Sequence, residues 1–208
     1  CRGNPISRTD GNGLADYVGN NGFHASDGIA DGNLYAVYDY AINAYQHDGD
    51  IINLKNSCVL LPNKQVRMEI ANNHFSRLQG HEATSIFSEN DFYTGEVNIM
   101  ETNSGTQSLF SAIEKAGEDI TQMIGVAHDH PIGSNSNPTK PKNTPTGSSL
   151  GDWSLFRYFR KNYNTAIKYG IVIFGEAKNQ TFTIFSPGST NDENLIKLNY
   201  DQFTGYGE

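Results

Sequence analysis

The chain has 208 residues, 37% of them hydrophobic, and a formal net charge of −8 at pH 7. A chain of this length can bury one full core and a small extra module, but not the cores of two large domains. Lysine and arginine form no long basic stripe, which argues against a nucleic-acid partner. No apolar run approaches the ~20 residues that a transmembrane helix requires, and the first residues lack the basic and apolar regions of a signal peptide.

The chain contains two cysteines, Cys1 and Cys58. Two cysteines are too few for a disulfide scaffold, and their separation does not match the spacing of zinc-binding cysteines. A cysteine at position 1 is also the residue that is acylated in lipoproteins after signal removal. The sequence leaves open whether Cys1 is lipidated or internal to a longer chain.

Residues 1–33 are rich in Gly, Asp and Asn and poor in apolar side chains, which predicts turns and little burial. The stretch from Cys1 to Leu14 resembles the end of the core of Rhs/YD-repeat proteins, although Gly11 and Asn12 interrupt the usual pattern. In those large exported proteins, this core end precedes a variable C-terminal toxin. The resemblance implies that the chain is the tail of a much larger exported polypeptide.

Residues 34–65 predict a small β-hairpin. The alternating stretch LYAVYDYAINAY, residues 34–45, is typical of a strand. Residues 47–50 predict a turn, and IINL, residues 51–54, predicts the second strand.

The next segment predicts a helix followed by a strand. Residues 66–79 carry apolar side chains at a helical period, and Gly80 stands where such a helix would end. Glu82 therefore lies at a junction between this helix and the strand that follows it. A further strand, VNIM, is expected at residues 97–100, and a helix is expected at residues 106–119.

The remaining elements complete an α/β pattern. A helical pattern begins at Asp152, and the segments IKYGIVIFG (167–175) and TFTIFSP (181–187) predict two strands. The polar tail, residues 187–208, is expected to wrap the surface. This order of helices and strands suits a mixed α/β sandwich.

His128 and His130 follow a short apolar run, residues 123–127, which predicts a buried strand that ends at Pro131. Residues two apart on a strand point to the same face, so the two imidazoles suit the nitrogen ligands of one divalent metal ion. Asp152 can supply a third ligand. Taken singly, a His-x-His pair is more often a surface or core pair, and Ser-x-x-Asp at a helix start is more often a cap. It is the combination that predicts a metal site.

The segments His128–Pro131 (HDHP) and Ser149–Asp152 (SLGD) together resemble the signature of the JAB/MPN metallopeptidases, also called the JAMM family. This family includes isopeptidases that remove ubiquitin and ubiquitin-like proteins. The resemblance implies a mixed-sheet, cytidine-deaminase-like α/β sandwich that holds Zn²⁺ through His128, His130 and Asp152. Residues 132–148 form a longer spacer than most relatives have. Their hydrophilic, turn-forming composition predicts an inserted flap that leaves both ends of the site in place.

The resemblance also implies a catalytic carboxylate upstream, and Glu82 stands at the helix-to-strand junction where relatives carry it. Glu82 would then act as the general base, and Ser149 would hydrogen-bond the tetrahedral oxyanion. Glu96 and Glu101 remain alternatives for the base. With zinc activating a water molecule, these residues predict hydrolysis of a peptide or isopeptide bond.

A second class of function stays open. Some members of the JAB fold have lost their metal site and serve as scaffolds or binding modules. The presence of His128, His130 and Asp152 favours the enzyme.

The expected organisation has three parts: an Rhs-core-end-like leader at residues 1–33, a β-hairpin at residues 34–65, and a JAB/MPN-like metallopeptidase domain at residues 66–208. The leader is expected to be detachable at little cost in stability. The two resemblances together imply a toxin or effector peptidase that is exported within an Rhs-type protein, with a cytoplasmic peptidase as the alternative. The implied partners are a protein or peptide substrate, such as a ubiquitin-like protein or a conjugated tail, and an immunity protein.

Overall fold

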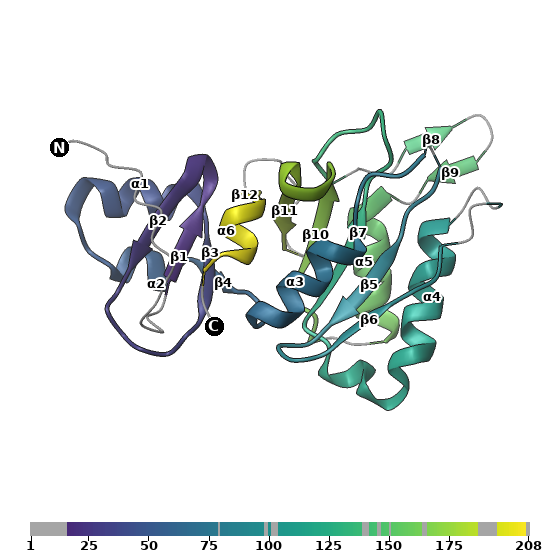
Figure 1. Cartoon of the computed structure of the whole chain (residues 1–208), viewed down its shortest axis with the longest axis horizontal. Coiled ribbons are helices and arrows are strands. Elements are labelled where there is room, and N and C mark those ends of the chain that lie inside the picture. Colours follow the sequence, from purple (N-terminus) through teal and green to yellow (C-terminus); the bar gives the residue numbers. More distant parts are fainter. Residues whose placement is uncertain are drawn as a thin grey trace.

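The computed structural model describes residues 16–78, 80–97, 100, 104–138, 142–144, 147–149, 151–163, 166–186 and 195–206. Over these residues the chain forms two mixed sheets and a separate two-stranded hairpin, with helices packed around them (Figure 1). The predicted α/β class is therefore confirmed. No helix in the described part of the chain is long and apolar enough to cross a membrane.

The smaller sheet has four strands in the order β2-β1-β3-β4. Its strands are β1 (Asp16–Gly19), β2 (Phe23–Ser26), β3 (Leu34–Val37) and β4 (Cys58–Leu60). The 3-10 helix η1 (Asn20–Gly22) joins β1 to β2, and α1 (Asp39–Asp48) and α2 (Ile52–Lys55) lie between β3 and β4. Strand β1 pairs antiparallel with β2 and parallel with β3, so β1 is an interior strand of this sheet.

This sheet contradicts the domain boundary expected after residue 33 and the hairpin expected at residues 34–65. Residues 16–26 supply two of its strands, and Tyr17 and Val18 in β1 are buried. The boundary expected after residue 33 therefore runs through a sheet. Residues 34–65 are not a hairpin, because the chain leaves β3 into helix α1 and IINL begins helix α2.

There is a physical reason why residues 34–45 were expected to form one strand but form a strand followed by a helix. Tyr38, Ala41, Ile42 and Tyr45 stand at helical intervals of three and four residues, and Ala41 and Ile42 of α1 pack into the core of this sheet. The short segment therefore satisfies a strand period and a helix period at once, and burial against β1 selects the helix.

The larger sheet has six strands in the order β12-β11-β10-β7-β5-β6. They are β5 (Thr84–Phe87), β6 (Phe92–Thr94), β7 (Gly125–Asp129), β10 (Tyr169–Phe174), β11 (Thr181–Phe185) and β12 (Ile196–Asn199). Only β7 and β10 pair in parallel; every other neighbouring pair among these six is antiparallel. The apolar strand that carries the histidines is thus an interior strand.

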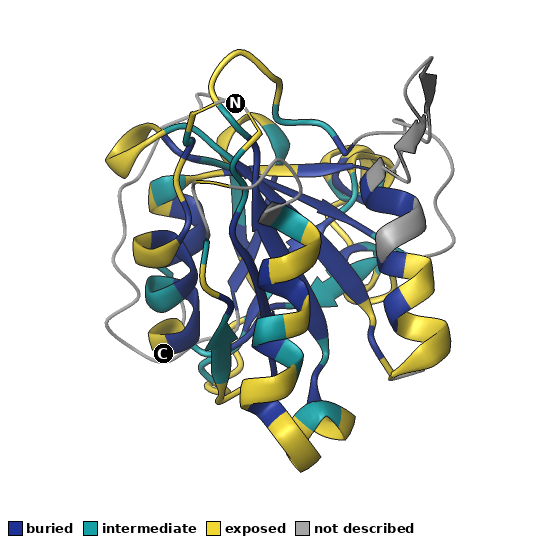
Figure 2. Ribbon diagram, turned by 90° about the vertical axis from the view of Figure 1, so that its right-hand side faces the viewer, coloured by how far each residue is buried: buried dark blue, intermediate teal, exposed yellow. Residues whose placement is uncertain are grey.

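Helices cover both faces of this sheet, and Figure 2 shows its buried strands between helices whose outer sides are exposed. The helices are α3 (Lys64–Asn73), α4 (Ser104–Ala116), α5 (Gly151–Asn162) and α6 (Tyr200–Thr204), with 3-10 turns η2 (Gly117–Gln122) and η3 (Ala177–Asn179). Val126 of β7 packs with α4 and α5, whereas Ala127 packs in the cluster that contains α3 and α6. Alternate residues of β7 therefore face different layers.

Three further expectations need correction. The helix expected at 66–79 ends at Asn73, because His74 and Ser76 are buried in an extended segment with hydrogen-bond partners of their own. The chain returns after β5 as the edge strand β6 (Phe92–Thr94), ahead of the expected strand VNIM, of which residues 98 and 99 lie outside the described part. The C-terminal residues do more than wrap the surface, since β12 extends the sheet and Phe203 of α6 is fully buried.

The C-terminal segment also joins the two sheets. Nε2 of Gln202 donates to the carbonyl oxygen of Gly19 at 2.8 Å. Arg67 of α3, with 1% of its surface exposed, donates to the carbonyl oxygens of Pro62 at 2.5 Å, Phe203 at 2.8 Å and Tyr206. One apolar cluster contains residues from both sheets. The N-terminal sheet is therefore packed into the structure rather than attached as a spacer.

Candidate metal centre

Strand β7 delivers the two histidines to the same side of the sheet. His128 belongs to β7 and stands opposite Thr84 of β5 and Val172 of β10. The chain then keeps its direction for one more residue, because the backbone N–H of His130 donates to the carbonyl oxygen of Ile173 at 2.8 Å. His128 is 5% exposed and His130 is 2% exposed.

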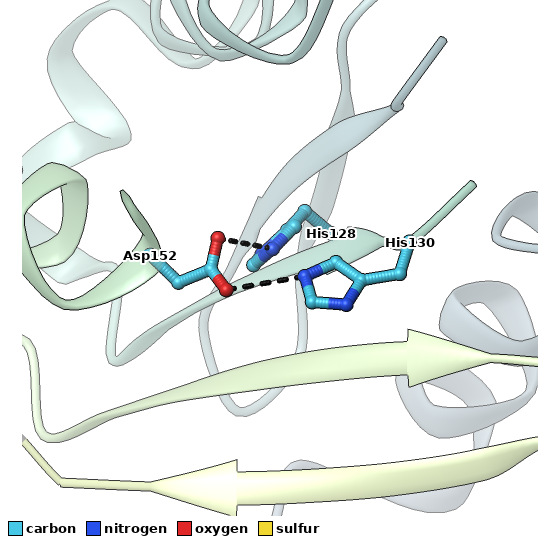
Figure 3. A group of neighbouring side chains, drawn as sticks. All are labelled: His128, His130 and Asp152. Carbon is cyan, nitrogen blue, oxygen red and sulfur yellow. Dashed lines mark hydrogen bonds and ion pairs between the residues drawn. The ribbon is translucent and has the colours of Figure 1, made fainter. Parts of the chain in front are cut away.

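Asp152 reaches both imidazoles from the first turn of α5, as Figure 3 shows. Its Oδ1 lies 2.9 Å from Nε2 of His128, and its Oδ2 lies 3.1 Å from Nε2 of His130. Each of the three residues offers one ligand atom, and these atoms lie within 4.8 Å of one another. The structure thus brings together the three residues that the sequence predicted as metal ligands, and the cluster can bind a metal ion.

The hydrogen bonds around His130 fit a metal ligand. Nδ1 of His130 lies 2.6 Å from the carbonyl oxygen of Asn135, so Nδ1 carries the proton that this bond requires. In the neutral ring, the lone pair then sits on Nε2, which faces a carboxylate oxygen of Asp152. Two acceptors in contact repel each other unless a proton or a cation lies between them. A backbone carbonyl that holds the remote nitrogen is the usual support for a metal-binding histidine.

His128 gives a second indication. Nε2 of His128 is buried and, although it lies close to Asp152, it makes no well-aligned hydrogen bond. Buried polar nitrogens are rarely left in this condition, because an unmade hydrogen bond costs about 1–3 kcal/mol. A divalent cation within reach of this nitrogen would supply the missing partner.

The charges in the cluster are strongly coupled. Burial lowers the pKa of His128, but the carboxylate of Asp152 outweighs burial and raises that pKa to about 9. Burial raises the pKa of Asp152, but the two imidazoles outweigh it and hold the pKa well below its ordinary value. Without a metal, the cluster therefore keeps a proton where a cation would sit.

Glu82 lies beside this cluster, two residues before β5 begins. Burial raises its pKa above the ordinary value, and the neighbouring charges of His128 and His130 oppose that rise. The carboxylate faces the first turn of α4, because a methyl group placed on Gly105 would lie 2.9 Å from Oε2 of Glu82. A raised pKa in a partly buried carboxylate is what a general base needs near neutral pH.

In the part of the chain that it describes, the structure does not place the other candidate catalytic residues, Glu96, Glu101 and Ser149, at the cluster. Glu96 is exposed and its Oε1 lies 3.7 Å from Nζ of Lys115, in a surface ion pair. Glu101 lies outside the described residues. Ser149 ends strand β9 (Gly147–Ser149), which pairs with β8 (Lys142–Thr144), but its side chain lies outside what the structure describes. Its role as an oxyanion donor stays a prediction.

The spacer between the two motifs contributes more than the predicted flap. Its first residues fold into a tight turn, in which the side chain of Ser134 donates to the carbonyl oxygen of Pro131 at 2.7 Å. This turn brings the carbonyl of Asn135 to His130. The second part forms the hairpin β8–β9, which projects at the upper right of Figure 1. The spacer therefore includes the support of one ligand as well as a hairpin.

Sequence reasoning missed two contributors, Asn135 and Asp129. Asn135 acts through its backbone carbonyl, which every residue has, so its type gave no signal. Asp129 stands between the two histidines and is 0% exposed. Strand alternation alone could have placed Asp129 on the opposite face of β7 from the ligands, where a buried charge requires partners.

In comparisons with protein-family models, with curated proteins and with solved structures, nothing matched this chain significantly.

Proposed function

We propose that the protein is a zinc-dependent hydrolase that cleaves a peptide or isopeptide bond, with a mechanism of the JAMM type. The observation that carries this proposal is the buried cluster of two imidazoles and one carboxylate, with a half-buried glutamate of raised pKa beside it. Two nitrogen ligands and one oxygen ligand form a donor set that zinc accepts in hydrolases.

The residues have distinct roles in this proposal. His128, His130 and Asp152 would hold the ion, and bound zinc would lower the pKa of a water molecule to about 7 and polarise the scissile carbonyl. Glu82 would accept a proton as the water oxygen attacks the carbonyl carbon. Glu82 would then return that proton to the amine nitrogen as the carbon–nitrogen bond breaks, which yields a carboxylic acid and a free amine.

The sequence supports the same class of reaction. The HDHP and SLGD segments resemble the JAMM signature, and they are the segments that place the three ligands together. The likeness of residues 1–14 to an Rhs core end extends the proposal to its setting. On this basis the chain acts as the C-terminal effector of an exported Rhs-type protein, on a protein or peptide of the recipient cell, and an immunity protein protects the producer.

The metal site is tested by measuring bound metal. After dialysis against dilute zinc, the purified chain should carry about one zinc per molecule, and the His130→Ala variant should carry much less because one ligand is missing. His47→Ala is the matched control, since His47 is exposed on α1. Equal zinc content in wild type and His130→Ala would rule out the site.

The reaction is tested through Glu82. The Glu82→Gln variant should keep its zinc but lose about 10²–10⁴-fold in hydrolysis of fluorogenic peptides and isopeptide-linked conjugates, because an amide cannot accept the proton. Glu96→Gln is the control for removal of a nearby exposed carboxylate. Full activity in Glu82→Gln would show that another residue is the general base. A zinc-loaded wild type that cleaves none of these substrates would favour a binding module.

The effector setting has a separate readout. Expressed in a test bacterium, the whole chain should arrest growth, whereas Glu82→Gln should not, at equal amounts of soluble protein. Arrest by both variants would mean that any toxicity does not depend on hydrolysis.

A further inference from the structure

A second group of buried polar side chains lies on the opposite face of β7 from the metal cluster. Its centre is the carboxylate of Asp129, which is 0% exposed. Oδ1 accepts the backbone N–H of Ala83 at 3.0 Å. Oδ2 lies 3.2 Å from Nδ1 of His74 and accepts Nη1 of Arg77. Both oxygens of one buried carboxylate are therefore occupied.

The three partners come from two segments of the chain. His74 and Arg77 belong to the extended segment after α3, and Ala83 immediately precedes β5. Ala83 and Asp129 are joined twice, because the backbone N–H of Asp129 also donates to the carbonyl oxygen of Ala83 at 3.2 Å. Ala83 is the residue next to Glu82. The bond from Asp129 therefore fixes the backbone from which Glu82 extends.

The same group contains an arrangement that resembles a hydrolytic triad. Oγ of Ser85 lies 2.6 Å from Nε2 of His74, whose Nδ1 faces Asp129. Ser85, His74 and Asp129 are each 0% exposed. No substrate carbonyl can reach Ser85 in this position. The arrangement is a support, not a second active site.

We propose that Asp129 is a positioning residue that holds Glu82 opposite the metal ligands, with Arg77 and His74 keeping its carboxylate in place. This inference rests on the proposed function, in which Glu82 is the general base. Both faces of strand β7 then contribute to the site. On one face, His128 and the following His130 are the metal ligands. On the other face, Asp129 fixes the position of the base.

A carboxylate is required at this position because two donors must be accepted by two different oxygens. The N–H of Ala83 approaches one oxygen, and the guanidinium of Arg77 approaches the other. Asparagine has the same shape but only one acceptor oxygen, and its NH₂ group would face one of the two donors. The bond to the charged guanidinium is the stronger of the two. Asp129→Asn should therefore keep its one oxygen toward Arg77 and release Ala83, and the segment that carries Glu82 should lose its fixed position.

The test follows Glu82 directly by NMR of protein labelled with ¹³C at the glutamate carboxylates, with zinc as the only added ligand. The Glu82 signal is assigned by its absence in Glu82→Gln. In the wild type this signal should shift when zinc binds, because the cation lies beside the carboxylate. In Asp129→Asn the zinc-induced shift should be lost, while the zinc-induced shifts of the His128 and His130 ring nitrogens remain.

Asp16→Asn is the matched control. Asp16 is also a buried aspartate with a histidine partner, since its Oδ1 lies 2.7 Å from Nε2 of His24, but it belongs to the N-terminal sheet. This variant should keep the full response of Glu82. If Asp129→Asn fails to fold because Arg77 faces no carboxylate, the double variant Asp129→Ala/Arg77→Met removes both charges and the acceptor for Ala83, and it should show the same loss.

The outcomes separate this inference from the proposed function. A full zinc response of Glu82 in either folded Asp129 variant would overturn the positioning role and leave the hydrolase proposal untouched. If zinc shifts the histidine signals of the wild type but not its Glu82 signal, Glu82 does not lie at the metal. That result would overturn both the positioning role of Asp129 and the role of Glu82 as general base.

Discussion

Gly105 lies in the first turn of α4, against the carboxylate of Glu82. A methyl group on Gly105 would come within 2.9 Å of Oε2 and 3.4 Å of Cβ of Glu82. The Gly105→Ala substitution should therefore push the flexible end of Glu82 aside. Because alanine favours a helix over glycine by about 0.5–1 kcal/mol, the fold should lose no stability. For the proposed hydrolase, we expect activity to fall by about 10²-fold, which is the cost of displacing a catalytic group by about 1 Å.

This prediction is checked by comparing activity with the thermal midpoint of unfolding. Thr106→Ala is the control, since Thr106 is an exposed neighbour in the same turn, and its substitution should leave activity unchanged. A Gly105→Ala variant that is fully active would mean that Glu82 tolerates displacement and is not the base.

At the scale of elements, α3 depends on one buried arginine. Arg67 is 1% exposed and donates to three backbone carbonyls, two of which belong to residues after β12. Burial lowers the pKa of Arg67 to about 10, so this side chain remains charged at neutral pH. A buried charge in this position is stabilised by those carbonyl oxygens and by the nearby Asp16 and Tyr169, and the carbonyls lose their donor when the guanidinium is removed.

We therefore expect Arg67→Met to lower the free energy of unfolding by about 2–4 kcal/mol, since each buried carbonyl left without a donor costs about 1–3 kcal/mol. Chemical denaturation measures the change. Arg157→Met is the control, because Arg157 is exposed on α5 and should tolerate the substitution within about 0.5 kcal/mol. A similar loss in both variants would show that Arg67 has no special role in joining α3 to the C-terminal segment.

At the scale of the whole molecule, the N-terminal sheet determines where the chain can be cut. Residues 34–208 lack β1 and β2, so β3 would lose its parallel partner and Gln202 would lose the carbonyl of Gly19. We expect this fragment to be insoluble or far less stable than the whole chain, in contrast to the sequence-based expectation of a detachable leader.

Circular dichroism and thermal unfolding of the two purified chains provide the check. If residues 34–208 unfold at the same temperature as the whole chain, the four-stranded sheet contributes little and the leader can be removed after all. This comparison must precede any growth assay with a shortened chain, because loss of toxicity through unfolding would resemble loss of catalysis.

The sequence alone predicted which three residues form the candidate metal cluster and the local element that carries each of them. His128 and His130 share a face because side chains alternate along a strand, and Asp152 opens a helix because the apolar period begins there. Both rules depend on local covalent geometry, so they hold whatever the rest of the chain does. The α/β class and the apolar strands β7, β10 and β11 were predictable for the same reason.

Only the tertiary structure decided which distant segments meet. Residues 16–19 became an interior strand because β2 and β3 offer them hydrogen bonds, and their polar neighbours in sequence gave no sign of this. Asp129 is held by His74, Arg77 and Ala83, which lie 46 to 55 residues earlier in the chain. A local pattern specifies the face on which a side chain stands, whereas its partners depend on which surfaces the whole chain buries together.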